Sequence, residues 1–137
     1  MEDHNNIQII KEHFAAFGRG DLQSALNMVA DTVDWQSPVT RSQPTEITWA
    51  VPRYTREEVG QFFQELSEKV QPEKFEITGF IAQDDKVVVE GRNKGKIKST
   101  GKSYEHDWVM VFTLRDGKII SHRHYYDTVD VTMAFQK

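Results

Sequence analysis

The sequence predicts one α+β domain in which helices pack on one face of a strongly curved, mainly antiparallel sheet. Its 137 residues suit a single domain spanning residues 1–137. Apolar residues recur at helical spacing in much of the first half, and after Pro72 the spacing changes to the alternation of strands. Helices followed by a run of hairpins are typical of an α+β domain, because consecutive hairpins build an antiparallel sheet.

The first two predicted helices lie at the N-terminus. Residues 6–17 carry apolar side chains every three or four positions, and Gly18 and Gly20 end this helix. Asp21 is placed to cap a second helix that extends to Val29. Residues 32–35 then read as a short strand. The apolar positions of the two helices are Ile7, Ile10, Phe14 and Phe17, then Leu22, Ala25, Leu26 and Val29.

A turn-rich stretch containing Pro38, Pro44 and Pro52 is too irregular for a helix or strand. The four residues 55–58 form a capping box, in which Thr55 and Glu58 each satisfy backbone groups at the start of a third helix. The buried face of that helix is predicted to hold Val59, Phe62, Phe63 and Leu66.

Four strands are predicted after Pro72, at residues 75–82, 86–98, 103–114 and 118–127. Turn residues separate them. Asp127 with Thr128 then caps a short C-terminal helix at 129–135, so Asp127 is expected to be structural rather than catalytic.

Alternation also predicts which face of each strand is buried. Glu90, Arg92, Lys94 and Lys96 share one side and should face solvent, so residues 87, 89, 91 and 93 should face the helices. The bulky positions 106, 108, 110, 112 and 114 should likewise be inside. The last strand is ambiguous by hydrophobicity, since positions 120, 122, 124 and 126 compete with 121, 123, 125 and 127.

Composition narrows the function classes. The formal net charge of −4 disfavours binding to nucleic acid, because an acidic surface repels phosphates. No cysteine is available for thiol catalysis, Cys-ligated zinc or disulfides. We see no signal peptide and no apolar run long enough to cross a membrane, so we expect a cytoplasmic protein without a membrane partner.

Four sequence segments occur in a characteristic order: residues 14–22, 31–35, 49–54 before Phe62 and Phe63, and 115–119 before residues 125–127. Together they resemble the SnoaL-like, ketosteroid-isomerase-related branch of the nuclear transport factor 2-like superfamily. The resemblance implies a cone-shaped α+β barrel: a bent sheet wrapped around three helices and enclosing one deep pocket. It also implies that His122, His124 and Tyr126 point into the cone.

The resemblance does not carry over a known active site. Ketosteroid isomerases use a tyrosine and two aspartates, and these fall at or beside His13, Trp35 and Trp108. None is kept, so we expect no isomerisation of Δ5-3-ketosteroids. The Asp-Arg-Asp set of limonene-epoxide hydrolases falls on Gly91, Asn93 and His124 and is also absent. SnoaL-like cyclases use inward His and Asp residues, and here no inward carboxylate is evident.

Histidines are the candidate catalytic residues. His124, on the pocket floor, is the candidate general base, with a hydrogen-bonded structural histidine as the alternative. His106 would orient a substrate carbonyl from the cone mouth or be a plain rim residue, and His122 reads as a satisfied core histidine. We expect no cofactor, and no metal either, since no carboxylate was identified beside these three histidines.

Aromatic and polar residues are expected to line a cavity for a flat or cyclic hydrophobic small molecule, with ordinary core filling as the alternative. The candidate ligand-binding residues are Trp35, Tyr54, Asn93, Trp108, His122 and Tyr126. For His13 and Trp49 the sequence leaves open whether they reach the pocket. The ligand should be uncharged or weakly anionic.

Three functions remain open at this point: an isomerase-, cyclase- or lyase-type enzyme that uses histidine acid/base chemistry, a non-catalytic binder of an apolar molecule, and a dimerisation module. The outer parity of adjacent strands places Val109, Val111 and Tyr125 in an apolar strip. Such a strip is typical of an interface, so we expect a homodimer through the outer sheet face.

Overall fold

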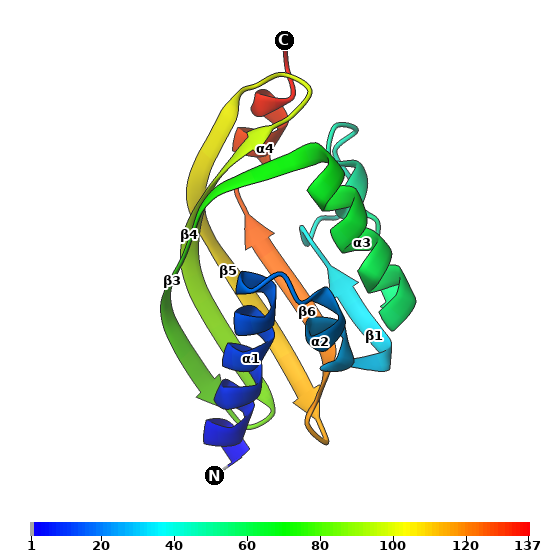
Figure 1. The fold of residues 1–137 in the computed structure, drawn as a ribbon, viewed down its shortest axis with the longest axis vertical. Helices are drawn as coiled ribbons and strands as arrows, with labels where there is room; N and C mark the ends of the chain where they lie inside the picture. The colour runs from blue at the N-terminus through cyan, green and yellow to red at the C-terminus, as the bar shows by residue number, and fades with distance from the viewer. Residues whose placement is uncertain (1) are drawn as a thin grey trace.

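Six strands form one sheet, against which four helices and a short 3₁₀ turn are arranged (Figure 1). The computed structural model describes residues 2–137, with side chains from residue 5 onward. The helices are α1 (Glu2–Gly18), α2 (Leu22–Asn27), α3 (Arg56–Lys69) and α4 (Thr128–Ala134), and the 3₁₀ turn is η1 (Thr48–Ala50). The strands are β1 (Val29–Gln36), β2 (Arg53–Thr55), β3 (Val70–Gln83), β4 (Lys86–Ile97), β5 (Ser103–Arg115) and β6 (Lys118–Tyr126).

The strand order is β2-β1-β6-β5-β4-β3. Every neighbouring pair is antiparallel except β1 and β6, which run parallel and place Trp35 beside His122. The predicted α+β cone is therefore confirmed, with a mixed sheet that stays open at its β2 and β3 edges. None of the helices in residues 2–137 is both long and apolar enough to cross a membrane.

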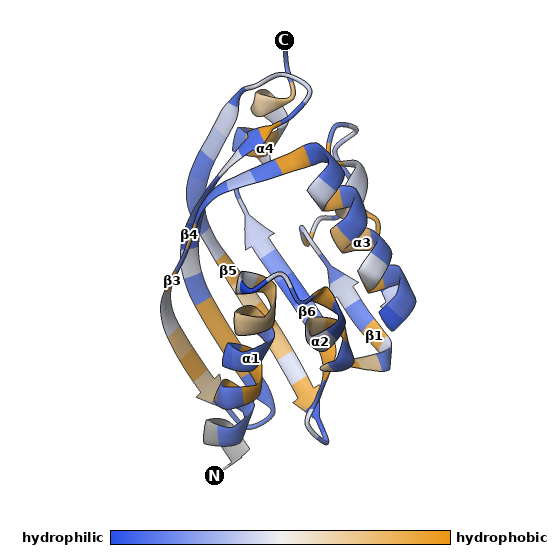
Figure 2. Cartoon of the chain, in the orientation of Figure 1, coloured by the Kyte–Doolittle hydropathy of each residue, from blue (hydrophilic) through white to orange (hydrophobic). Residues whose placement is uncertain are grey.

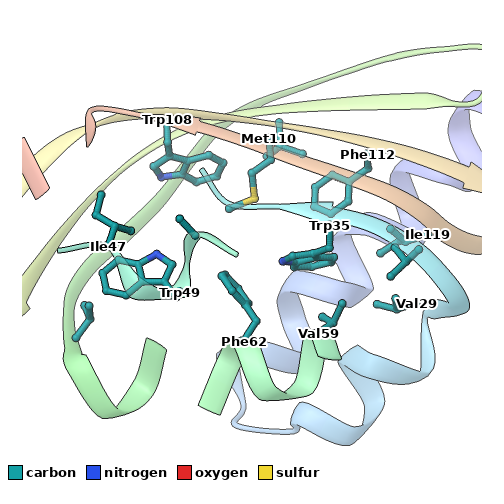
Figure 3. Close-up of a cluster of buried hydrophobic side chains, with 14 of the residues drawn as sticks. Val29, Trp35, Ile47, Trp49, Val59, Phe62, Trp108, Met110, Phe112 and Ile119 are labelled. Atoms are coloured by element: carbon teal, nitrogen blue, oxygen red, sulfur yellow. The ribbon is translucent and has the colours of Figure 1, made fainter. Parts of the chain in front are cut away.

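The N-terminal helices α1, α2 and α3 lie on one side of the curved sheet, and α4 lies near the end where β4 turns into β5 (Figure 1). Alternating hydropathy is visible as bands along β4 and β5 in Figure 2. Side chains of the sheet meet those of α3 in a buried cluster, where Trp35 lies between Phe112 and Val59 (Figure 3). Trp35 and Phe112 are among the largest fully buried residues.

Helix starts follow the predicted caps. The Asp21 carboxylate accepts a hydrogen bond from the Ser24 amide, and the Asp127 carboxylate accepts one from the Asp130 amide. At α3 the Thr55 hydroxyl accepts from the Glu58 amide at 3.1 Å. These caps are local interactions over three residues, which is why the sequence alone predicts them.

Strand bounds differ from the prediction where pairing depends on distant segments. β1 begins at Val29, which the sequence assigned to a helix, and β3 begins at Val70 because Val70 pairs with Ile97. The short strand β2 was not predicted at all; it forms by pairing Thr55 with Thr32.

A bulge in β6 changes which residue is buried at the start of that strand. Leu114 pairs with Ile119 while Thr113 pairs with Ser121, so the register skips one residue of β6. Ile119 is therefore the buried residue at this end, in place of the expected Ile120, and His122, His124 and Tyr126 keep the inward parity.

Candidate functional site

A cavity of about 1080 Å³ lies between α1, α3 and the concave face of the sheet. Its wall is largely aromatic, and several polar side chains reach it from β4, β5 and β6. Of the predicted site residues, those that line it are Trp35, Asn93, His106, His122, His124 and Tyr126. Trp108 and Tyr54 are not part of the lining.

Tyr54 was expected to approach the pocket from the loop, and this placement is wrong. Its side chain is 57% exposed. In β2 the flanking residues Arg53 and Thr55 pair with β1, and the Arg53 guanidinium contacts Glu65 on α3. Tyr54 lies on the opposite parity and faces away from the cavity.

Trp108 belongs to the core rather than the ligand site. The indole is 2% exposed and stacks on Phe75, with ring centroids 5.1 Å apart and planes 17° apart. It fills the space left by Gly91 on the neighbouring strand, where a Cβ would lie 2.3 Å from the Trp108 Cζ2 atom. The alternative of core filling therefore applies to this residue.

His122 forms part of the inner wall beside Trp35. The two rings stack with centroids 3.8 Å apart, and burial holds the pKa of His122 well below its usual value. Its Nδ1 atom has no hydrogen-bond partner among the described residues. The histidine is buried as expected, but it is not the fully satisfied core residue that the sequence suggested.

His124 points into the cone with one ring nitrogen engaged. Its Nδ1 lies 3.0 Å from the Ser37 hydroxyl, while Nε2 is buried without a partner in the described chain. Burial, aided by the nearby His106, lowers the pKa of His124 to about 3. At neutral pH this ring is uncharged and a weak base, which suits a hydrogen-bonding role better than proton abstraction.

His106 pairs with a carboxylate that sequence reasoning missed. Its Nδ1 lies 2.9 Å from Oδ2 of Asp130 in α4, and the same oxygen accepts the Glu105 amide at 3.0 Å. Because a carboxylate only accepts, Nδ1 donates and the ring tautomer is set. The expectation that no carboxylate lies beside these histidines is therefore wrong, although Asp130 itself is not part of the cavity lining. The only local signal was the position of Asp130 in the first turn of the C-terminal helix.

The His106 ring is enclosed rather than placed on the rim. Its side chain is 8% exposed and lies between two tyrosines. The ring centroids are 5.2 Å from Tyr104 and 5.8 Å from Tyr126, with planes within 23° and 10° of parallel. The expected position at the cone mouth is corrected, because α4 covers this end of β5.

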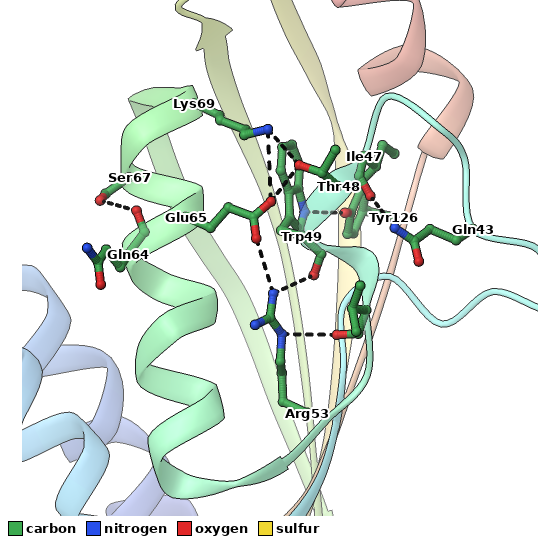
Figure 4. A network of polar contacts seen from close by, with 11 residues as sticks. Gln43, Ile47, Thr48, Trp49, Arg53, Gln64, Glu65, Ser67, Lys69 and Tyr126 are labelled. Atoms are coloured by element: carbon green, nitrogen blue, oxygen red, sulfur yellow. Dashed lines mark hydrogen bonds and ion pairs between the residues drawn. The ribbon is translucent and has the colours of Figure 1, made fainter.

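Tyr126 supplies a hydroxyl beside this histidine. The Trp49 indole N–H donates to the Tyr126 oxygen at 3.1 Å, so Trp49 does reach the pocket (Figure 4). Burial raises the pKa of Tyr126, which keeps its proton in place at neutral pH. A phenol that accepts one hydrogen bond retains its own proton to donate to a ligand oxygen.

The segment between β1 and β2 forms one side of the cavity and is fastened to α3 (Figure 4). Arg53 contacts Glu65 at 3.4 Å and also donates to the Trp49 carbonyl. Lys69 donates to the Thr48 hydroxyl at 2.7 Å. This network holds Trp49 in position for its contact with Tyr126.

His13 reaches the cavity from α1. Its ring is 1% exposed, and Nδ1 lies 3.1 Å from the Ala25 carbonyl, to which the neutral ring donates. Burial lowers its pKa to about 4. His13 is therefore a neutral wall residue that also ties α1 to α2.

Charged residues also line the cavity, and all of them are lysines: Lys74, Lys94 and Lys98. Lys94 was expected on a solvated face. Instead the register of β3 and β4 shifts between Pro72 and Lys74, and here the adjacent residues Asn93 and Lys94 both border the cavity.

Among the residues that the structure describes, no three or more His, Cys, Asp or Glu side chains lie close enough together to hold a metal ion.

Similarity to known proteins agrees with this architecture. The family model of the SnoaL-like domain matches residues 10–122. An NTF2-like protein from Burkholderia xenovorans LB400 has 33% sequence identity and a TM-score of 0.84, with 98% of each chain covered. An NTF2-like protein from Burkholderia thailandensis E264 has 26% identity and a TM-score of 0.84, covering 96% of this chain and 98% of that one.

A third structure, from Mesorhizobium loti, is provisionally named a SnoaL-like polyketide cyclase. It has 22% identity and a TM-score of 0.71, covering 88% of this chain and 97% of that one. No curated protein matches the chain.

Proposed function

The chain belongs to the SnoaL-like domain family, and we propose that it is an enzyme that binds a cyclic, largely apolar substrate and moves a proton at a carbon beside a carbonyl group. The family hosts several chemistries, so the proposal depends on the cavity itself. The observation that carries it is the hydrogen bond between Asp130 and His106, whose ring lines the cavity.

His106 has the arrangement of a general base. With Nδ1 donating to Asp130, the lone pair belongs to Nε2, which makes no hydrogen bond within the described part of the chain. The Asp130 carboxylate also stabilises the imidazolium that forms when Nε2 takes up a proton. The Asp130 side chain is 33% exposed, while the His106 ring that it holds is only 8% exposed and borders the cavity.

The neighbours of His106 supply hydrogen bonds to the oxygen of an enolate. Tyr126 retains a phenolic proton, and its ring lies parallel to that of His106. His124 lies next to Tyr126, with ring centroids 4.6 Å apart. In the tautomer whose Nδ1 accepts from the Ser37 hydroxyl, the buried and unpartnered Nε2 carries the N–H and can donate. Donors aimed at developing negative charge in a water-poor site contribute strongly to catalysis.

The remaining wall suits a flat apolar body. Phe62, Phe63 and Phe112 line the cavity with Trp35, and a volume of about 1080 Å³ has room for several fused rings. The provisional cyclase name of the Mesorhizobium loti relative fits this class of substrate.

Deuterium exchange tests the proposal without knowledge of the natural substrate. A panel of fused-ring ketones such as 1-tetralone is incubated with the protein in D₂O, and loss of the proton signal beside the carbonyl is followed by NMR. We expect exchange above the buffer rate, and His106→Gln should lower it by on the order of 10²–10⁴-fold. Asp130→Asn should also lower it and change its pH profile, because the amide no longer holds the same tautomer.

Tyr54→Phe is the control, since it changes an exposed aromatic residue on β2 outside the cavity and should leave exchange unaltered. Exchange at the buffer rate across the panel would contradict the enzymatic proposal.

A second candidate function is that of a non-catalytic binder. It is favoured by the buried polar atoms of Trp35, Asn93 and His124 that have no hydrogen-bond partner among the described residues. Ligand-induced NMR shifts without exchange would support that candidate.

A further inference from the structure

We propose that Lys74, Lys94 and Lys98 form an anion-binding subsite at the open side of the cavity, so that the natural ligand is an amphipathic carboxylate. Its apolar ring body would occupy the aromatic cavity, and its carboxylate would meet the lysines. This inference shares with the proposed function only the assumption that the apolar part of the ligand occupies the same cavity.

The charge of the cavity lining differs from that of the whole chain. The protein carries a formal net charge of −4, with 21 acidic and 17 basic residues. The lining nevertheless contains three lysines and no Asp, Glu or Arg. Three of the four lining histidines, His13, His122 and His124, have lowered pKa values and add no positive charge at neutral pH. Positive charge in a concave site raises the local concentration of anions.

The lysines at this rim lack carboxylate partners. No ion pair within 4.0 Å involves any of the three among the side chains that the structure describes, whereas Lys69 nearby pairs with Glu65. Glu105 is the β5 neighbour of Lys94 in register, yet the two form no such pair. Without a carboxylate partner, these three ammonium groups keep their charge available to an anionic ligand in the cavity.

Strand pairing provides an independent argument. Lys74 on β3 lies directly opposite Lys94 on β4 in the register of the sheet. Like charges in directly opposed positions destabilise a strand pair, and an anion between them relieves the repulsion. Lys98 follows the end of β4 and reaches across to α3, where its ammonium donates to the Ser67 carbonyl at 2.8 Å. Both Lys98 and Ser67 border the cavity.

The separation between the charged lysines and the uncharged polar groups of the cavity should orient the ligand. The groups around His106, His124 and Tyr126 are uncharged donors and acceptors apart from the Asp130 carboxylate behind His106. A carboxylate placed there would face Asp130, whereas the lysine rim stabilises it. The carbonyl end should therefore lie inward and the charged end outward.

Two fluorescent probes that differ only in charge test this inference. 8-Anilinonaphthalene-1-sulfonate is an amphipathic anion, and N-phenyl-1-naphthylamine is the same skeleton without the sulfonate. In fluorescence titrations of the full chain, the triple variant Lys74→Gln, Lys94→Gln and Lys98→Gln should bind the anion about tenfold to a hundredfold more weakly than the unsubstituted protein. Binding of the neutral probe should change by less than about twofold. Salt should weaken binding of the anion only.

A matched triple variant separates a local subsite from the overall charge. Lys11→Gln, Lys86→Gln and Lys102→Gln removes the same total charge from positions outside the lining and should leave binding of the anion nearly unchanged. Displacement of the anionic probe by 1-naphthylacetate, with weaker displacement by its methyl ester, would extend the result to carboxylates.

Equal loss of anion binding in the two triple variants would overturn the proposal, and so would equal loss for both probes. Circular dichroism spectra that match the unsubstituted protein would show that the variants fold. The readout is binding and requires no turnover. A failed deuterium-exchange experiment would therefore contradict the proposed enzyme and leave this subsite standing.

Discussion

At the scale of single residues, the same side-chain type takes different roles according to its surroundings. His106 donates to a carboxylate, His124 meets a hydroxyl, and His13 donates to a backbone carbonyl. Burial lowers the pKa of His13 and His124, because a charged imidazolium loses its hydration in the cone. Burial and hydrogen-bond partners, rather than residue type, decide which histidine suits proton transfer.

The buried histidines predict loss of stability in acid. The pKa of His13 is about 4 in the folded chain against 6.5 as its ordinary value, so between these limits the unfolded chain binds a proton that the folded chain excludes. The free energy of unfolding should therefore be highest above pH 6.5 and fall as the pH drops toward 4. His13 alone should contribute a loss of about 3 kcal/mol, with further loss from His122 and His124.

Urea denaturation at several pH values between 7 and 4 measures this fall. In His13→Leu the number of protons taken up on unfolding in this window should decrease by close to one. The variant also loses the bond to Ala25, so its stability at pH 7 should drop by about 1–3 kcal/mol. An unaltered slope against pH in His13→Leu would contradict the assignment.

At the scale of elements, the cone depends on close approach between neighbouring strands. Gly91 of β4 lies opposite Trp108 of β5, and the indole occupies the space that a side chain at position 91 would take. The carbonyl of Glu76 on β3 crowds the same point from the other strand. A glycine in a strand interior can thus mark a site where a large neighbour needs room.

Gly91→Ala should therefore be strongly destabilising. Its Cβ would lie 2.3 Å from both the Glu76 carbonyl oxygen and a Trp108 ring carbon, and neither backbone nor buried indole can yield without shifting the sheet. We expect a loss of at least about 1–3 kcal/mol in urea denaturation. Gly79→Ala on β3 is the matched control, because its nearest contact is a Glu90 carboxylate oxygen at 3.8 Å. Equal effects of the two substitutions would refute the steric explanation.

At the scale of the whole molecule, the convex face of the sheet carries apolar side chains next to charged ones. Tyr125 is 45% exposed and pairs in register with Val109, while Val111 pairs with Arg123. Arg123 in turn forms an ion pair with Asp34 on β1. The cavity lies on the opposite, concave side, so association through the convex face would leave the ligand site open.

We predict a homodimer formed through the strip of Val109, Val111 and Tyr125. Light scattering at micromolar concentration should give about twice the chain mass of 15.9 kDa. Val111→Arg should shift the protein toward monomer, because it buries a charge in a self-complementary apolar contact. Val129→Arg is the control, since Val129 is a 66% exposed apolar residue of α4 rather than of the sheet. A monomer mass for the unsubstituted protein would refute the prediction.

The sequence by itself determined the features that arise from neighbours in the chain. Asp21, Thr55 and Asp127 cap the helices as predicted, because a cap joins residues only three positions apart. Alternation placed most side chains of β4 and β5 on the correct face, since the period of a strand is a local property. These features were enough to predict an α+β domain and the inward placement of Asn93, whereas the cone shape was implied by the resemblance to the SnoaL-like family.

The tertiary structure alone decided which groups meet across long sequence separations. Asp130 meets His106 because α4 folds back over β5, and no spacing in the sequence indicates that contact. Lys94 borders the cavity because a register shift lies nearby, and Tyr54 turns outward because β2 pairs with β1. A one-residue shift moves a side chain to the other face of a sheet, so pairing partners and bulges decide the site. The physical reason is that such contacts depend on the packing of the complete chain.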